Sequence, residues 1–425
     1  MNKFIASAGA IALSASAVNA SPIESVDPGK PWTVGLSLRG FYDDNYVTAT
    51  SGNERDSFGL DISPSVAYRI DPSDRTSLGL RYTFGATWYQ DRQSLNSNND
   101  SWDYSHALDG FLEHQFTQRL SLNVRDTFVI AQEPGLLNDL ATPYRTEGNN
   151  LRNNGQISLT AVLTRELSLV LGYNNTYVDY EQSGGTVANP SLSGLLDRTE
   201  HEGLVNLRWQ AAKESAILFG YNYKEVLHNS DEFIVIAGSP LAPQKADYRN
   251  NQSHIAYLGL DQNVSKDLVV TVRGGAEFVD YYNDTTGADD TSPYGQVAVN
   301  YTYRPNSTAS LGWTYSHQAT DVLSVDGSGG ITQDQDASVL FAGINHYFDS
   351  RWQGKVNGFW QNSTYNGGGF DGESENFFGV ALGLSYRFNR HLTGDVGYSF
   401  DTLTSDLPGR DYDRNRVFLG VTAVY

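Results

Sequence analysis

Apolar and polar residues alternate strictly along most of this chain, and the alternation recurs in many short segments. From Phe58 to Ile70 every second residue is apolar, and the residues between them are polar or small. Because successive side chains of a strand point to opposite faces, this pattern predicts a β-strand with one apolar and one polar face. No long segment of helical period follows the first twenty residues.

The alternating segments are joined by connections of two kinds. Eight short turns fall at residues 71–74, 117–119, 164–166, 210–214, 265–267, 304–307, 349–351 and 389–391. Nine longer segments, rich in Asp, Asn, Gly, Ser and Thr, lie between them. Together these connections join eighteen strands, although the strand assignment is ambiguous at 255–260 and 339–348. An even number of strands with short turns on one side and long loops on the other is typical of outer-membrane barrels.

The predicted fold class is all-β: a single transmembrane antiparallel up-and-down β-barrel of about 18 strands over residues 32–425. Lipid cannot satisfy an open sheet edge, so a membrane-spanning sheet must close on itself. Short turns on the periplasmic side and long extracellular loops then place both termini of the barrel on the periplasmic side. A soluble sheet with one wet face has the same alternation, so the distribution of aromatic residues has to distinguish the two.

Aromatic residues of the apolar face gather near the ends of the predicted strands, where Tyr and Trp prefer the membrane–water interface. The predicted aromatic girdle includes Trp32, Trp88, Trp209, Trp313, Trp352, Trp360 and Tyr425. Alternation in the last strand continues to the terminal Tyr425, a pattern that the barrel-assembly machinery recognises in such proteins. That machinery is therefore an expected partner, together with outer-membrane lipid and lipopolysaccharide.

The N-terminus predicts export. Residues 1–20 have the basic start, apolar run and small residues before the cleavage point of a signal peptide, with Val18-Asn19-Ala20 at that point and Ala15-Ser16-Ala17 as the alternative. No later run approaches about 18 apolar residues, the length of a membrane-spanning helix. Residues 21–31 would form a short periplasmic segment with no room for a plug domain, which argues against an energy-coupled transporter. The expected location is the cell outer membrane.

The net charge and the composition exclude some functional classes of protein. The formal net charge of −20 argues against nucleic-acid binding, which requires basic patches. Acidic loops either keep the protein soluble or bind divalent cations at a lipopolysaccharide surface. Without Cys the chain has no disulfide and no thiolate site.

Charged residues also fall on the polar face, which would line the lumen. Arg81, Arg125 and Arg273 lie six residues after Arg75, Arg119 and Asp267, which end short turns or directly follow one, so they are expected at one level. The predicted pore-lining residues are Arg81, Arg125, Arg273, Arg39, Lys355, Asp61, Glu113 and Glu277. They either create a cationic lumen that favours anions or acidic saccharides, or pair with one another as confined charges usually do.

No enzyme, cofactor or metal site is predicted. His106, His201, His254 and His317 lie near loop bases but lack the context of a catalytic triad, so they are interpreted as structural or rim histidines. Four acidic residues of one Gly-rich loop could supply oxygen ligands for Ca²⁺, but their spacing does not match a calcium-binding loop. A solvated acidic loop is the preferred interpretation of Asp321, Asp326, Asp334 and Asp336.

Four short motifs carry a family resemblance: Gly40-Phe41-Tyr42-Asp43-Asp44-Asn45, Asp126-Thr127-Phe128 followed by Glu133-Pro134, Leu196-Asp197-Arg198, and Asn415-Arg416-Val417-Phe418-Leu419-Gly420. Through them the chain resembles outer-membrane β-barrel proteins of the "β-barrel porin 2" type over most of its mature length. Members often accompany exopolysaccharide synthesis and export systems. The resemblance therefore implies a polysaccharide-related role, and it carries over no catalytic residues.

Three functions follow as hypotheses. The first is a porin for passive diffusion of small solutes, which could include saccharides. The second is an exopolysaccharide secretion channel or its accessory. The third is a closed barrel with a structural or adhesive role at the cell surface.

Overall fold

The computed structural model describes residues 30–92, 101–131, 149–184, 191–235, 244–284, 289–327 and 329–425. The predicted signal peptide, residues 1–20, and all but the end of the predicted segment 21–31 lie outside the described residues. The motif residues Glu133 and Pro134 also lie outside them. Among the described residues, no helix is long and apolar enough to cross a bilayer.

Long strands dominate the described chain. Their bounds are β1 Trp32–Asp43, β2 Ser57–Ser73, β3 Thr76–Tyr89, β4 Trp102–Thr117, β5 Leu120–Ala131, β6 Asn150–Val162, β7 Leu167–Tyr180, β8 Arg198–Ala212, β9 Ser215–His228, β12 Asn251–Asn263, β13 Leu268–Asp280, β14 Asp289–Arg304, β15 Ser307–Gln318, β16 Asp334–Tyr347, β17 Trp352–Asn366, β18 Ser374–Arg387, β19 Leu392–Ser405 and β20 Tyr412–Val424. The connections add helix α1 Leu192–Leu196, the 3-10 helices η2 Ala246–Arg249 and η3 Gly368–Phe370, and a small hairpin of β10 Phe233–Val235 and β11 Gln244–Lys245.

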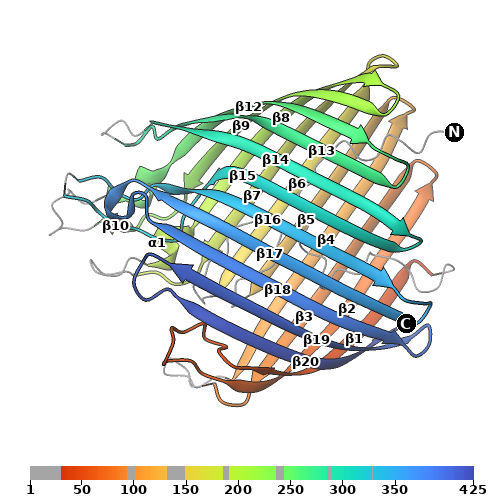
Figure 1. Ribbon diagram of the computed structural model, residues 1–425, viewed down its shortest axis with the longest axis horizontal. Coiled ribbons are helices and arrows are strands. Elements are labelled where there is room, and N and C mark those ends of the chain that lie inside the picture. The colour runs from red at the N-terminus through yellow and green to blue at the C-terminus, as the bar shows by residue number, and fades with distance from the viewer. Residues whose placement is uncertain are drawn as a thin grey trace.

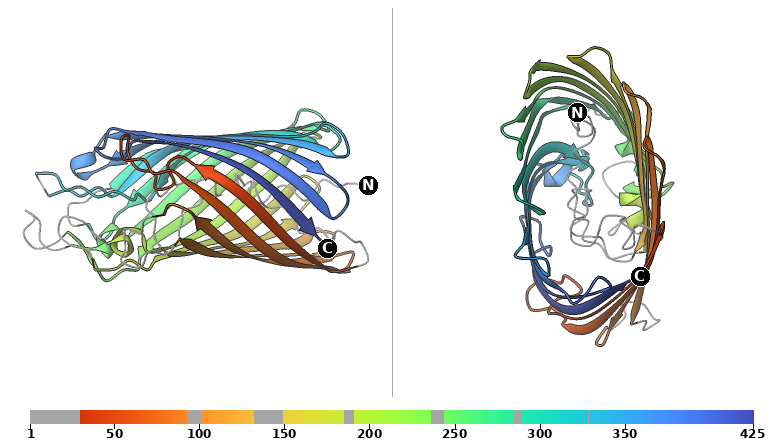
Figure 2. Two further views of the ribbon diagram at one scale, coloured as in Figure 1. Left: turned by 90° about the horizontal axis from the view of Figure 1, so that it is seen from below. Right: turned by 90° about the vertical axis from the view of Figure 1, so that its right-hand side faces the viewer.

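The eighteen long strands form one closed antiparallel barrel (Figure 1). Each strand pairs with the next along the chain, and β9 pairs with β12. The last strand returns to the first, with Gly35 opposite Val424 and Asp43 opposite Arg416, so no edge is left open. Seen along its axis, the ring is elongated, and α1 lies within its outline (Figure 2). The predicted fold class and strand number are confirmed.

The eight short turns lie at one end of the barrel, here called the turn end, and the long connections lie at the other, the loop end (Figure 1). The chain finishes at the turn end with β20. Strand β2 extends through Ser73 before turning at residues 74–75, so this turn is tighter than predicted. The two ambiguous segments are the strands β12 and β16.

The two faces of each strand differ as the alternation predicted. On β1 the side chains of Trp32, Val34, Leu36 and Leu38 are all exposed on the outward face. The side chains that alternate with them, at Thr33, Ser37 and Arg39, face the lumen and are less exposed. Apolar side chains exposed around a whole closed ring fit a hydrocarbon surrounding, because they would be unfavourable in water.

The residues of the predicted aromatic girdle lie at different heights on the barrel. Trp32, Trp209, Trp352 and Tyr425 are exposed at the turn end, where the rings of Trp32 and Tyr425 have centroids 5.9 Å apart. Trp88 and Trp360 lie toward the loop end of their strands. Trp313 lies in the middle of β15, and its indole N–H donates to the Ser338 hydroxyl at 3.0 Å.

The outward face also carries a polar group on β5 and β6. Asp126 lies between Val124 and Phe128 in the outward alternation, and its carboxylate accepts two hydrogen bonds from the Asn153 amide, at 3.1 and 3.2 Å. The amide thus satisfies part of the hydrogen-bonding capacity of a charge that lipid could not solvate.

Candidate functional site

The lumen wall carries polar side chains and ion pairs between strands, beside a buried apolar cluster that includes Val339, Phe359 and Phe377. Arg39 of β1 donates to Asp395 of β19 at 3.0 Å, and Arg208 of β8 donates to Asp261 of β12 at 3.2 Å. The first pair crosses Gly420 of the intervening strand β20. A Cβ atom at position 420 would lie 2.5 Å from Arg39 Cγ, so glycine makes room for this pair.

The three arginines predicted at one level lie in different surroundings. Arg81 and Arg125 flank β4, whereas five strands separate β5 from Arg273 on β13. Arg81 donates to Asp109 at 3.3 Å, and its side chain is only 17% exposed. Arg125 lies 3.6 Å from Glu113, and its side chain is 63% exposed. Arg273 donates to the Gln296 amide oxygen at 3.1 Å. The three side chains therefore do not form one cluster.

The other predicted pore-lining residues have separate environments. Asp61 accepts a hydrogen bond from Thr87 at 2.8 Å and lies opposite Arg39 in the β1–β2 register. Glu277 is buried and accepts from the Ser253 hydroxyl at 2.8 Å. Lys355 lies on β17, opposite Asn345 of β16 and Gly383 of β18.

At the loop end, three connections pack into an apolar cluster that we call the loop layer. Its members come from β7 and the β7–β8 connection, from the β9–β12 connection and from the β15–β16 connection: Val178, Tyr180, Leu192, Leu195, Leu196, Ile234, Ala246, Tyr248 and Ile331. Helix α1 begins after Ser191, whose hydroxyl accepts from the Gly194 N–H. Burial of these side chains holds three loops together over one part of the barrel mouth.

A buried arginine joins the three connections of the loop layer. Arg249 of η2 is completely buried. Its guanidinium donates to the backbone carbonyls of Leu195 in α1 at 3.4 Å, Thr320 at 2.9 Å and Gln333 at 3.2 Å. The five N–H donors of arginine suit this role, because one side chain can satisfy carbonyls from several segments. The sequence analysis did not identify Arg249.

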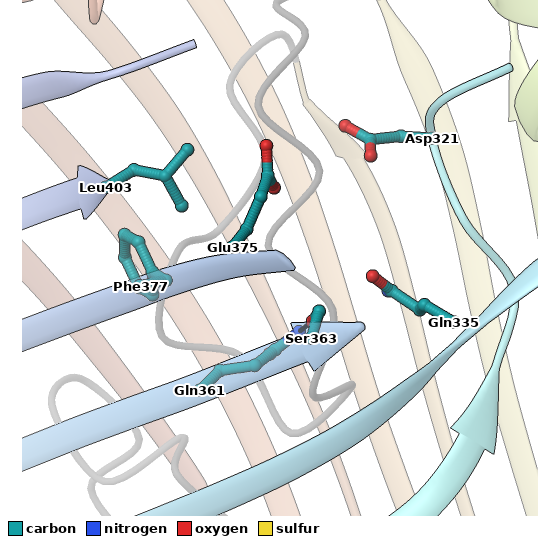
Figure 3. A pocket seen from close by; sticks show the side chains of 7 residues that line it. All are labelled: Asp321, Gln335, Gln361, Ser363, Glu375, Phe377 and Leu403. Atoms are coloured by element: carbon teal, nitrogen blue, oxygen red, sulfur yellow. Dashed lines mark hydrogen bonds between the residues drawn. The ribbon is translucent and has the colours of Figure 1, made fainter. Parts of the chain in front are cut away.

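A second polar group adjoins the loop layer through Asp321, which directly follows Thr320 in the chain. Arg410, between β19 and β20, donates to both carboxylate oxygens of Asp321 at 3.2 Å and also pairs with Glu375 of β18. Asp321 and Glu375 point toward one another across a small recess (Figure 3). The recess is lined by Asp321, Gln335, Gln361, Ser363, Glu375, Phe377 and Leu403. Ion pairs thus fix the β19–β20 connection to two other parts of the mouth.

The loop layer contains a carboxyl group whose protonation is expected to change its stability. Asp197 follows α1, is 7% exposed, and accepts hydrogen bonds from the Tyr180 N–H and the Ser193 hydroxyl. Burial raises the pKa of the Asp197 carboxyl to about 6, although these hydrogen bonds oppose the rise. A raised folded-state pKa favours folding fully below about pH 4, and that contribution is lost as the pH rises through about 6.

We therefore expect residues 191–197 to exchange amide hydrogens more readily at pH 7.5 than at pH 5, after correction for intrinsic rates. Asp197→Asn keeps the hydrogen-bond acceptor without the charge, so it should abolish this pH dependence. Asp231→Asn, which changes a fully exposed carboxylate of a neighbouring loop, is the matched control. An unchanged pH dependence in Asp197→Asn would contradict the assignment.

The closed ring of eighteen antiparallel strands, with an apolar exterior, a polar ion-paired interior and long loops at one end, defines an outer-membrane β-barrel of the channel and transporter type. Residues 323–425 match the model of the family described as "Putative beta-barrel porin 2". The match confirms the predicted resemblance for these residues, which hold β16 to β20 and the end of the preceding loop, whereas the resemblance expected over the rest of the mature chain stays a prediction. No curated protein matches the chain.

The chain is similar to several solved outer-membrane proteins at low identity. OccAB4 of Acinetobacter baumannii is 12% identical, with 94% of this chain and 100% of that chain covered and a TM-score of 0.44. The FrpB iron transporter of Neisseria meningitidis is 12% identical, with 93% and 81% covered and a TM-score of 0.44. OpdK of Pseudomonas aeruginosa is 11% identical, with 93% and 99% covered and a TM-score of 0.43.

Proposed function

We propose that this protein is a porin of the cell outer membrane, through which small hydrophilic solutes, saccharides included, diffuse passively. The observation that carries the proposal is the ion-paired lumen wall, with Arg39–Asp395, Arg81–Asp109 and Arg208–Asp261 distributed around the ring. Charged pairs are costly in a dry interior, and water in the lumen removes most of that cost. The loop layer narrows the mouth at the loop end, and no enzymatic role is proposed.

The test is the single-channel current of the refolded mature protein in a planar bilayer, with a salt gradient to measure selectivity. Steady conductance is the expected result. A silent bilayer, from protein whose folding is verified by heat-modifiable gel mobility, would contradict the porin. It would favour the exopolysaccharide or structural alternatives.

The anion-to-cation selectivity of the channel is expected to depend on how exposed each arginine side chain is, rather than on how many arginines line the lumen. Arg125 and its partner Glu113 have side chains that are 63% and 51% exposed, whereas Arg81 and its partner Asp109 are better shielded, at 17% and 33%. We expect Arg125→Gln to lower the anion-to-cation permeability ratio by about twofold to fivefold, since one charge at close range in water is worth about 1 kcal/mol. Arg81→Gln is the matched variant. It leaves Asp109 without its arginine, but at a better-shielded position, so the permeability ratio should change less. Unchanged reversal potentials in Arg125→Gln would refute this role.

Partners are proposed from the outer surface. The exposed apolar band is expected to contact outer-membrane lipid, and the loop end is expected to contact lipopolysaccharide. Leu419, Val421 and Tyr425 of the last strand are exposed on the outward face. We propose that this strand is recognised by the barrel-assembly machinery before it pairs with β1 to close the ring.

A further inference from the structure

Strands β14 and β15 separate near the loop end of the barrel. Their register is continuous to the pair Gly295 and Tyr315, and no pairing between the two strands continues beyond it. His317 lies two residues past this point and is opposite Asp336 of β16. The separation lets side chains from β14 and β16 approach the imidazole of His317.

One nitrogen of His317 is fixed as a hydrogen-bond donor. Nε2 lies 3.0 Å from the Tyr281 hydroxyl oxygen and 3.0 Å from Asp334 Oδ2, and the Tyr281 hydroxyl itself donates to Asp334. All three side chains are more than nine-tenths buried. Because the Tyr281 hydroxyl donates to Asp334, we assign the ring proton of His317 to Nε2, which then donates to these oxygen atoms. A carboxylate that holds one ring N–H in this way is the usual outer-shell partner of a metal-binding histidine.

The other nitrogen, Nδ1, then presents a lone pair to two carboxylates. It lies 3.6 Å from Asp336 Oδ1 and 3.9 Å from Asp290 Oδ2, and it is buried without a hydrogen-bond partner. Ligand atoms of Asp290, His317 and Asp336 all lie within 4.8 Å of one another. Asp336 is held in place by the Ser292 hydroxyl at 2.8 Å and the Tyr315 hydroxyl at 3.3 Å. The Nδ1 lone pair of His317 and the carboxylates of Asp290 and Asp336 are therefore close enough to bind one ion.

We propose that Asp290, His317 and Asp336 bind a divalent transition-metal ion of the zinc class. One imidazole nitrogen and two carboxylate oxygens suit such an ion, whereas Ca²⁺ and Mg²⁺ prefer oxygen ligands alone. Three protein ligands leave a further position for water. The bound ion would join β14 to the β15–β16 pair where their backbone hydrogen bonds end. This function is separate from diffusion through the lumen.

The other histidines near loop bases show what a rim histidine looks like in this barrel. His106, His201 and His254 each share a hydrogen bond of 2.7–2.8 Å with a tyrosine hydroxyl through Nδ1. Their Nδ1 atoms are therefore satisfied by a neutral group on the outward face. His317 differs, because carboxylates surround it and its Nδ1 has no hydrogen bond.

The test is calorimetric titration of ZnCl₂ into the chelator-treated, folded, full-length mature barrel without an affinity tag. We expect one equivalent to bind, with CaCl₂ and MgCl₂ competing poorly. His317→Gln and Asp336→Asn should each weaken zinc binding by at least about tenfold to a hundredfold, since loss of even an outer-shell partner has that effect. His254→Gln is the matched control and should bind zinc as the wild type does. Heat-modifiable mobility verifies the fold of every variant.

Three outcomes would overturn the proposal: no zinc binding to the wild type, undiminished binding in the folded ligand variants, or preference for Ca²⁺ over Zn²⁺. Absence of zinc binding would indicate that a protonated imidazolium balances the two carboxylates instead. If His317→Gln does not fold, Asp290→Asn decides, because Asp290 is 41% exposed and its replacement disturbs little of the buried network. Porin conductance is measured separately, so failure of either proposal leaves the other testable.

Discussion

Replacing Arg249 with methionine is expected to raise the single-channel conductance and the rate of current fluctuations. The substitution keeps a long side chain but removes the guanidinium that joins the carbonyls of Leu195, Thr320 and Gln333. Hydrogen bonds to a charged donor contribute about 1.5–3 kcal/mol each, and buried carbonyls left without partners add a further cost. The loop layer should therefore lose about 3–5 kcal/mol and open over the lumen.

The barrel itself should tolerate this substitution, because its eighteen strands are hydrogen-bonded independently of the loops. Arg165→Met, in an exposed turn at the opposite end, is the matched control and should leave the current unchanged. Arg249→Lys keeps the charge but can reach fewer carbonyls, so it should have an intermediate effect. Wild-type conductance and noise in a folded Arg249→Met variant would show that the loop layer does not limit the channel.

Replacing Leu311 with lysine is expected to lower the free energy of unfolding in a bilayer by about 2–4 kcal/mol, the cost of a cation near the middle of the lipid-facing wall. Leu311 is exposed on the outward face, opposite Val299 of β14 and Ala342 of β16. Its two cross-strand neighbours are apolar, so the charge would have no carboxylate directly opposite and little access to water.

Ser310→Lys provides the matched comparison, because the neighbouring residue on the same strand faces the lumen. A lysine there can extend into water, so its cost should be small. Reversible denaturant unfolding in lipid vesicles measures both variants. Equal costs for Leu311→Lys and Ser310→Lys would contradict the assignment of the two faces.

The ion pairs and the loop layer were beyond sequence reasoning because they depend on contacts between distant segments. Equal spacing from the turns suggested that Arg81, Arg125 and Arg273 share a level, but the neighbouring strands give Arg81 and Arg273 different partners. The acidic β15–β16 loop was interpreted as solvated. That interpretation is wrong for Asp334, which is 2% exposed, and for Asp321, which pairs with Arg410.

The sequence by itself determined the barrel: its antiparallel strands, its short turns and the direction in which each strand face points. Those properties follow from a two-residue period and from turn residues, which act locally. Only the tertiary structure decided which loops meet at Arg249 and which carboxylates meet at His317. The loops have no periodic pattern, and their contacts depend on the strand register around the closed ring. That register brings residues into contact that lie far apart in the chain, such as Arg249 and Gln333, which are 84 positions apart.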